Sequence, residues 1–191
     1  MENRTKNIMI VGVGGQGTLL ASKTLGKLLL SQGYDVKVSE VHGMSQRGGS
    51  VVTYVRFGEK VYSPIIDKGE ADFIVSFEKL EAARWLEYLK PEGVMITNLH
   101  QTDPMPVITG AMEYPENLVE KMQAMGVKTD AVEALNLAEK AGTVKAVNLV
   151  LLGRLSRYFD FAEEAWFDAI EACVPDKFLE LNKEAFLLGR N

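Results

Sequence analysis

Hydrophobic positions along this chain follow two alternating patterns, short unbroken runs and longer stripes at helical spacing. Residues 8–11 read Ile-Met-Ile-Val without a polar break, which is typical of a strand buried on both faces of a sheet. In residues 18–30 the apolar positions fall on one face of a helix that ends near Gly33. Strand-like and helix-like patterns then recur to the end of the chain, and this rhythm predicts an α/β fold.

The same patterns predict the remaining elements. Strands are expected at residues 34–39, 51–57, 60–66, 71–77, 94–97 and 127–130, with one more short strand at 107–109. Helices are expected at residues 78–89, 116–125, 131–141, 144–159, 162–172 and 176–188. Gly58 and Glu59 are typical of a two-residue hairpin turn, and residues 91–93 of a separate turn. The helix at 144–159 is apolar around most of its circumference, which places it in the core or between subunits.

The third strand departs from the usual arrangement of a dinucleotide-binding sheet. Only about ten residues connect the second strand to the third, too few for a parallel crossover through a helix. The third strand is therefore expected to run antiparallel. We predict a Rossmann-like, three-layer α/β/α fold in one domain, residues 1–191. Its sheet is mostly parallel but mixed, with a β-hairpin after the second strand and extra C-terminal helices.

A glycine-rich loop follows the first strand. Gly12, Gly14 and Gly17 stand at GxGxxG spacing between a strand and a helix, where backbone N–H groups and the helix dipole can hold a phosphate or another anion. In such loops the third glycine lets the helix pack close to the strand. A purely structural turn is the alternative. Glu40, at the end of the second strand, is a candidate ligand for ribose hydroxyls or simply a solvated carboxylate.

A second polar loop begins where the second strand ends. Residues 41–50 read Val-His-Gly-Met-Ser-Gln-Arg-Gly-Gly-Ser, so Arg47 places a cation next to backbone N–H groups. Ligand loops gather at the carboxyl edge of a doubly wound sheet, so this loop is expected beside the first one. The alternative is a flexible polar connector. The candidate binding residues are Gly12, Gly14, Gly15, Gln16, Gly17, His42, Ser45, Gln46, Arg47, Gly48, Gly49 and Ser50.

Charge and cysteine content narrow the classes of function. The 191 residues carry a net charge of −5 and no basic run, which argues against nucleic acid as a partner. No apolar run is long enough to cross a membrane and no signal-peptide pattern is visible, so the expected location is the cytoplasm. The single cysteine, Cys173, is expected to be a buried structural thiol, and one thiol cannot hold an iron–sulfur cluster alone. With only His42 and His100 in addition, no metal site is expected.

Two stretches give the chain a resemblance to a known family. Residues 10–20 read IVGVGGQGTLL and residues 38–52 read VSEVHGMSQRGGSVV, with one helix and one strand between their loops. Further matching segments are 58–65 (GEKVYSPI), 69–71, 77–89 (FEKLEAARWLEYL), 145–153 (KAVNLVLLG) and 175–189 (PDKFLELNKEAFLLG). On these segments the chain resembles the small, beta- or gamma-type subunits of 2-oxoacid:ferredoxin oxidoreductases, most closely those of the indolepyruvate enzymes. Residues 102–117 match the family only loosely.

The resemblance implies a subunit of a larger enzyme. Such complexes oxidatively decarboxylate a 2-oxoacid with coenzyme A, giving an acyl-coenzyme A, carbon dioxide and reduced ferredoxin. They use thiamine diphosphate, magnesium and iron–sulfur clusters, which the resemblance assigns to a large partner subunit rather than to this chain. No catalytic residue is therefore expected here, and the two loops would hold coenzyme A phosphates or face the partner. The assembly would be a hetero-oligomer, with a homodimer open for the isolated chain.

Three alternatives stay open at this point. The chain could serve another 2-oxoacid, such as pyruvate, 2-oxoglutarate or 2-oxoisovalerate. It could be a free-standing Rossmann-type oxidoreductase that binds NAD, with Glu40 on the ribose and His42 as the one plausibly placed acid or base. It could also be an interaction protein whose glycine loop has lost its ligand. The residues themselves do not separate coenzyme A binding from contact with a partner.

Overall fold

In the computed structural model, which describes residues 5–41 and 49–191, six strands form one sheet in the order β2-β3-β1-β4-β5-β6. The strands are β1 (Lys6–Val13), β2 (Asp35–Val41), β3 (Ser50–Gly58), β4 (Ala71–Ser76), β5 (Leu89–Asn98) and β6 (Lys128–Val132). Strands β1, β4, β5 and β6 are parallel, whereas β3 runs antiparallel to both β1 and β2. The predicted mixed sheet and the antiparallel third strand are both confirmed.

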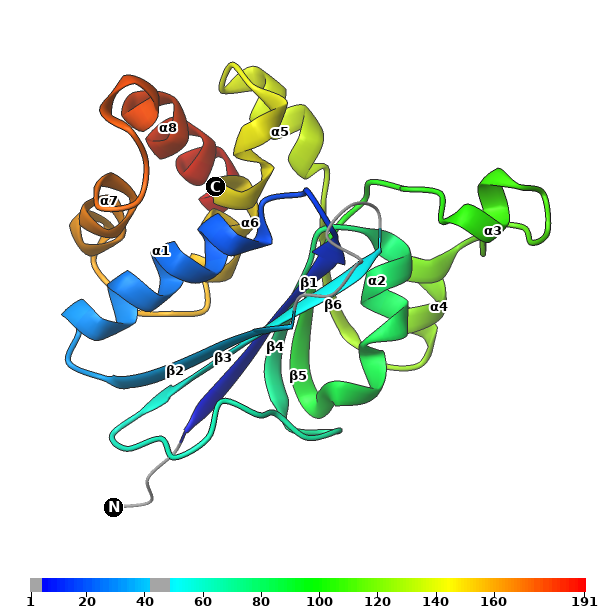
Figure 1. Cartoon of the computed structure of the whole chain (residues 1–191), viewed down its shortest axis with the longest axis horizontal. Coiled ribbons are helices and arrows are strands. Elements are labelled where there is room, and N and C mark those ends of the chain that lie inside the picture. Colours follow the sequence, from blue (N-terminus) through cyan, green and yellow to red (C-terminus); the bar gives the residue numbers. More distant parts are fainter. Residues whose placement is uncertain (1–4, 42–48) are drawn as a thin grey trace.

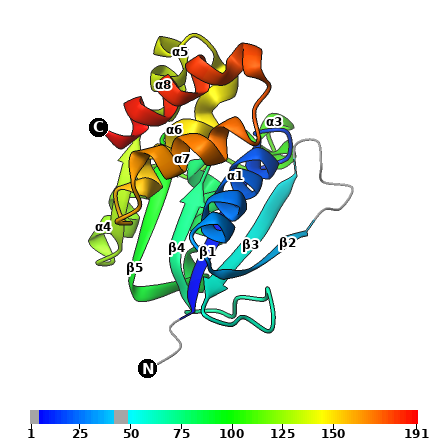
Figure 2. The same ribbon diagram turned by 90° about the vertical axis from the view of Figure 1, so that its left-hand side faces the viewer.

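Helices cover both faces of this sheet (Figure 1; Figure 2). One face carries α1 (Thr18–Ser31), α5 (Ala134–Lys140), α6 (Val147–Ser156), α7 (Glu163–Glu171) and α8 (Leu179–Arg190). The opposite face carries α2 (Lys79–Arg84) and α4 (Leu118–Ala124), with the short α3 (Met105–Ile108) standing apart. Short 3₁₀ turns lie at Leu86–Tyr88, Val144–Ala146 and Asp176–Phe178. The three-layer α/β/α prediction, with extra C-terminal helices, is therefore confirmed.

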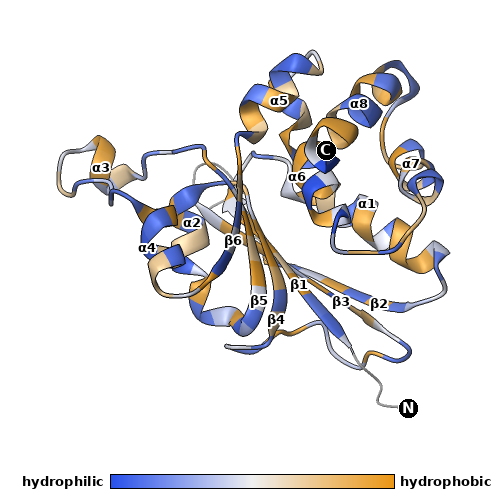
Figure 3. Cartoon of the chain, turned by 180° about the vertical axis from the view of Figure 1, so that it is seen from behind, coloured by the Kyte–Doolittle hydropathy of each residue, from blue (hydrophilic) through white to orange (hydrophobic). Residues whose placement is uncertain are grey.

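Strand β1 divides its side chains between two hydrophobic cores. Ile8 and Ile10 pack into the core under α1 and the C-terminal helices, while Met9 and Val11 pack into the core under α2 and α4. All four side chains are fully buried. Alternate residues of a strand point to opposite faces, so the unbroken apolar run follows directly from covering both faces of the sheet. In Figure 3 the central strands are accordingly coloured as hydrophobic.

Helix α6 lies in the middle of the larger core, as its apolar sequence predicts. Leu149, Val150, Leu151 and Leu152 are all fully buried, and α8 crosses the helix at very short distance. A Cβ atom on Gly153 would lie 2.0 Å from the Phe186 carbonyl oxygen, and one on Gly189 would lie 2.0 Å from the Val150 carbonyl oxygen. The two helix backbones can approach this closely only because neither position carries a side chain.

The strand predicted at residues 60–66 does not form, and that part of the hairpin prediction is wrong. Both edges of β3 are already occupied, by β2 and β1, so β3 has no free edge to pair with a following hairpin strand. The segment is held by side chains instead. The Arg56 guanidinium donates to the carbonyl oxygens of Ser63 and Ile65 at 3.0 and 2.7 Å, and the Asp35 carboxylate accepts from the Val61 N–H at 2.9 Å. The antiparallel pair after the first helix is β2 with β3.

Five further predictions need correction. The helix expected at 78–89 ends as α2 at Arg84, and the turn expected at 91–93 is an irregularity inside β5, where the pairing with β4 shifts register. The strand expected at 107–109 is instead the end of α3. The helix expected at 131–141 begins only at Ala134, because the residues before it pair with β5. Cys173 is partly exposed rather than buried.

No helix in the described part of the chain is long and apolar enough to cross a membrane.

The contact between α6 and α8 yields a direct test of the fold. Gly153→Ala places a methyl group against the backbone of α8, so we expect the free energy of unfolding to fall by about 2 kcal/mol or more. Urea unfolding of the isolated chain measures this. Gly26→Ala is the matched control, because its Cβ would meet only Val38 Cγ2 at 3.8 Å. The free energy of unfolding of that variant should stay the same or rise by up to about 1 kcal/mol, because alanine has a higher helix propensity than glycine. Equal stability of the two variants would contradict the close crossing.

Candidate functional site

The carboxyl edge of the sheet brings the first glycine loop against the base of the second loop. Gly12 pairs with Val51 and Val13 with Ser50 where β1 and β3 meet. The Gly14 N–H then donates to the Gly49 carbonyl oxygen at 2.9 Å. The structure thus places Gly49 and Ser50 beside the first loop, as predicted. His42, Ser45, Gln46, Arg47 and Gly48 lie outside the described residues.

The glycines of the first loop lie in different surroundings. Gly17 is the N-cap of α1 with φ 92°, a left-handed conformation that strongly favours glycine. Its nearest neighbour is the Asn148 side chain of α6, whose Nδ2 would lie 3.2 Å from an added Cβ. The closest approach at this third glycine is therefore between the loop and helix α6. Gly12 is the position crowded within the motif, against the Gln16 and Phe77 side chains.

Gln16 is committed to the loop itself. Its side-chain Oε1 accepts a hydrogen bond from the Val13 N–H at 2.8 Å, and the backbone N–H of Gln16 donates to the Val13 carbonyl oxygen at 3.2 Å. The side chain therefore closes the turn between β1 and α1. The loop amides are held in place by this bridge, and a fixed array of amides is what an anion site at a helix N-terminus requires.

A buried carboxylate on α2 holds the base of the second loop. Glu81 is only 2% exposed, and its carboxylate accepts a hydrogen bond from the Ser50 hydroxyl and pairs with the Arg84 guanidinium at 2.9 Å. The indole Nε1 of Trp85 reaches the same Ser50 oxygen at 3.4 Å. Ser50 is thus fixed from α2 by its side chain and from β1 by its backbone, so the chain re-enters the sheet at a well-defined point.

A cavity of about 520 Å³ opens directly beside the first loop. Gly15, Gln16 and Gly17 form one wall, and Lys145 and His100 bring an amine and an imidazole from two other segments. The remaining walls are mainly apolar: Leu20, Phe77, Leu135, Val144 and Val147. Asn98 and Asn148 add side-chain amides that are themselves 2% exposed. Among the described residues that line this cavity there is no carboxylate, so its chemistry suits an anion with an apolar portion.

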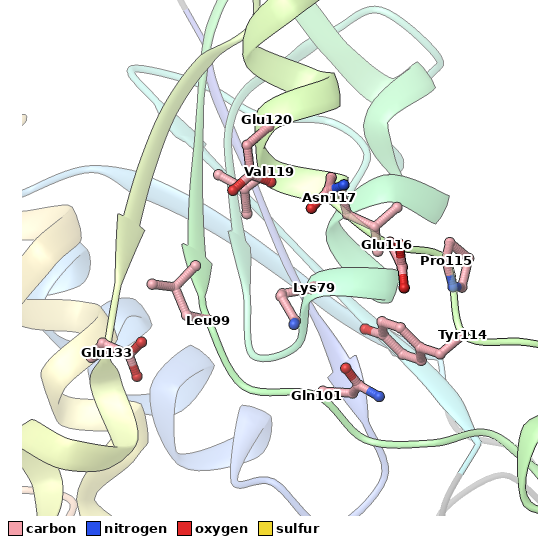
Figure 4. Close-up of a pocket in the computed structure, with 11 residues that line it drawn as sticks. Lys79, Leu99, Gln101, Tyr114, Pro115, Glu116, Asn117, Val119, Glu120 and Glu133 are labelled. Carbon is pink, nitrogen blue, oxygen red and sulfur yellow. The ribbon is translucent and has the colours of Figure 1, made fainter.

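A larger cavity, of about 730 Å³, lies on the other side of the sheet edge (Figure 4). Glu116, Glu120 and Glu133 line it together with the single amine of Lys79. Three carboxylates against one amine would repel a phosphate or another anion. The candidate site for an anionic ligand is therefore the smaller cavity at Gly15–Gly17, despite its lower volume.

Glu40 has a structural partner. Its Oε1 accepts a hydrogen bond from the Ser22 hydroxyl of α1 at 2.8 Å, and Ser22 is buried. The carboxylate thus ties β2 to α1, a role that neither alternative from the sequence anticipated.

In the described residues, no group of three or more His, Cys, Asp or Glu side chains is placed to hold a metal ion.

Several residues of this edge were missed in the sequence. Asn148 could have been noticed, because it is the one polar residue in the apolar run Val147–Leu152 of an otherwise buried helix. Asn98 and His100 follow a strand that ends at the carboxyl edge, which is also a usable signal. Lys145 and Glu81 carry no such signal, since a lone charged residue on a helix is usually solvent-exposed.

Comparison with known proteins places the chain within one family. Residues 7–191 match the family described as pyruvate ferredoxin/flavodoxin oxidoreductase. The chain is 45% identical to an indolepyruvate oxidoreductase subunit IorB of Thermococcus kodakarensis, over 96% of this chain and 93% of that protein. It is 44% identical to the subunit of the same name from Pyrococcus horikoshii, with the same coverage of both.

A solved structure has the same fold. The gamma subunit of a keto/oxoacid ferredoxin oxidoreductase from Geobacter sulfurreducens superposes with a TM-score of 0.72 at 23% identity. The match covers 97% of this chain and 96% of that one. At this identity the comparison supports the fold, so the chemistry of the edge must be argued from the residues described above.

The role of Gln16 can be tested on the isolated chain. Gln16→Ala removes the acceptor for the Val13 N–H, so we expect the free energy of unfolding to fall by about 1–2 kcal/mol. Gln16→Glu keeps an acceptor of the same length and should unfold within about 0.5 kcal/mol of the unchanged chain. Urea unfolding followed by circular dichroism measures both. If the alanine variant were as stable as the glutamate variant, the side-chain bridge would not be holding the loop.

Proposed function

Because this chain belongs to the pyruvate ferredoxin/flavodoxin oxidoreductase family and is the small subunit of a 2-oxoacid:ferredoxin oxidoreductase, we propose that its enzyme acts on indolepyruvate or a similar aryl 2-oxoacid. The support is the 45% and 44% identity, over nearly the whole chain, to two subunits named for indolepyruvate. The proposed reaction joins the acyl group to coenzyme A, releases carbon dioxide and passes two electrons to ferredoxin. We infer that this takes place in the cytoplasm.

We propose that a large partner subunit supplies the cofactors. Thiamine diphosphate with magnesium provides the decarboxylation chemistry when bound, and iron–sulfur clusters carry the electrons. A cluster of four iron atoms is ordinarily held by four thiolates, and this chain has one cysteine. Cys173 is also remote in sequence from both loops of the candidate site. This chain's own contribution is then to bind, to orient and to exclude water at its edge of the complex.

The contribution we assign to this chain is to seat coenzyme A at the carboxyl edge of its sheet. The observation that carries this is the Gly14–Gly49 hydrogen bond, which joins the two glycine loops. The first of these loops lines the 520 Å³ cavity through Gly15, Gln16 and Gly17. Coenzyme A combines phosphates with a long, weakly polar pantetheine arm. Loop amides, Lys145 and His100 match the phosphates, and the apolar walls match the arm. Arg47, from the sequence, would add a second cation from the neighbouring loop.

A broader form of the proposal is that the same edge receives acidic groups of the large subunit. The two forms of the proposal predict different effects when a charged residue of this edge is removed. Loss of a phosphate contact raises the apparent KM for coenzyme A, whereas loss of an inter-subunit ion pair weakens assembly. Both must be measured on the same reconstituted complex.

Lys145→Ala tests coenzyme A binding. Removing the amine should raise the KM for coenzyme A about tenfold and leave kcat within about twofold, because the lost contact is made equally in the ground and transition states. Steady-state assays of the reconstituted complex, with ferredoxin reduction as the readout, give both constants. Lys140→Ala, an exposed lysine at the end of α5, is the matched control. An unchanged KM with intact assembly would exclude coenzyme A binding in this cavity. Weakened assembly would instead favour contact with acidic groups of the large subunit.

A titration with NADH separates this proposal from the dinucleotide-binding alternative. Glu40 already accepts the Ser22 hydroxyl, and the antiparallel β3 replaces the crossover that completes a dinucleotide-binding half. We therefore expect no saturable change in NADH fluorescence on addition of the isolated chain at micromolar concentration. Saturable binding, lost in Glu40→Ala, would support a Rossmann-type oxidoreductase and count against the accessory role.

A further inference from the structure

Residues 99–117, here called the arm, leave the sheet after β5 and return at α4. Figures 1 and 3 show that its short helix α3 stands away from the layer formed by α2 and α4. Three large apolar side chains of the arm are mostly exposed: Met105 at 66%, Ile108 at 64% and Met112 at 65%. Exposed apolar residues are common singly, but three on one projecting segment are typical of an interaction surface.

The base of the arm is firmly attached to the body. Glu78 is 1% exposed and caps α2 by accepting the Glu81 N–H at 2.9 Å. Its second oxygen accepts the Thr102 N–H at 3.2 Å and the Tyr114 hydroxyl, so one carboxylate holds both ends of the arm. Burial, together with the hydrogen bond to Glu78, raises the pKa of Tyr114, and its hydroxyl therefore stays a donor throughout the physiological range.

The outer part of the arm also has a defined shape. The Pro104 carbonyl oxygen accepts from the Ile108 N–H at 3.1 Å, and the Pro106 carbonyl oxygen accepts from the Ala111 N–H at 2.8 Å. The apolar side chains are thus presented on a preformed turn. Preformed contacts lose little conformational entropy on binding, which is an advantage for a docking element.

The size and shape of the arm argue against a second copy of this chain as its partner. Three such side chains present on the order of a few hundred Å², whereas a stable interface covers about 800 Å² on each partner. Two convex arms meeting tip to tip would cover little more than these side chains. A concave partner that encloses the arm would also cover its backbone and flanks, and so reach the required area.

The arm is also negatively charged. Asp103, Glu113 and Glu116 flank the apolar tip, and residues 99–117 contain no lysine or arginine. At its base, His100 lines the candidate coenzyme A cavity, so the arm continues the edge already assigned to the complex. The matching surface is therefore an apolar groove with a basic rim, close to the enzyme's active centre.

We propose that the arm inserts into such a groove on the large, cofactor-bearing subunit and anchors this chain to it through Met105, Ile108 and Met112. The inference rests on the proposed function, which supplies the large subunit as partner. Anchoring by a few central apolar side chains is the usual energetic pattern of protein interfaces. The acidic flanks orient the arm and speed its association.

The test compares two sets of exposed apolar residues in the full-length chain. Met105→Ser/Ile108→Ser/Met112→Ser removes the tip, and Tyr62→Ser/Met125→Ser, at positions 87% and 73% exposed, is the matched control. Binding to the separately purified large subunit is measured by biolayer interferometry. The arm variant should bind about 100-fold more weakly and the control within about twofold of the unchanged chain. Thermal unfolding midpoints of both variants should match that of the unchanged chain, since all five side chains are exposed.

Each remaining outcome overturns the proposal in a recognisable way. Equal binding by the arm variant and the control would exclude the arm as the anchor while leaving the proposed function intact. A dimer of the isolated chain that the arm variant alone dissolves, with binding to the large subunit retained, would identify a second copy as the occupant. If the unchanged chain itself did not bind the large subunit, the proposed function would fail together with this proposal.

Discussion

Strand β1 pairs with neighbours that run in opposite directions, and the rest of the structure depends on this pairing. On one edge it pairs in parallel with β4, and on the other it pairs antiparallel with β3. The antiparallel pair aligns Val13 with Ser50, so the start of β3 meets the end of β1. Two glycine-rich segments are thereby joined through Gly14 and Gly49, which are 35 positions apart in the chain. A parallel third strand would have carried the second segment to the far end of the sheet.

Helix α2 holds the base of the second loop and the arm in place. Within its first turn, the buried carboxylates of Glu78 and Glu81 each hold a different segment, the arm and the base of the second loop. Because Glu78 also accepts the Glu81 N–H, the two anchors share one short stretch of backbone. Buried carboxylates are costly unless their oxygens are satisfied, and here hydrogen bonds and the Arg84 guanidinium satisfy them. The loop edge and the arm are thus fixed relative to each other.

The sequence predicts this fold wherever burial alone decides the pattern. Residues 8–11 are apolar because both faces of the sheet are covered, and residues 147–152 are apolar except for Asn148 because all sides of α6 are covered. Both patterns predict the elements that form. Residues 60–66 follow a hairpin-turn signal, but a hairpin strand also needs a free edge on β3, which local pattern does not encode. Glu78 and Glu81 look like surface residues of an amphipathic helix, since only the folded chain supplies Ser50, Thr102 and Tyr114 as partners.

The glycine motif shows why a site must be argued from its surroundings. Its spacing is that of a dinucleotide loop, yet Gly17 approaches Asn148 of a C-terminal helix, and Gln16 closes the turn with its own side chain. The motif keeps the property that its backbone dictates, a set of fixed amides at the start of α1. The neighbours of those amides come from far along the chain, where Lys145 and His100 add an amine and an imidazole to the cavity. The surroundings thus keep the chemistry of a candidate anion site, while Glu40, the candidate ribose ligand, accepts a hydrogen bond from the Ser22 hydroxyl.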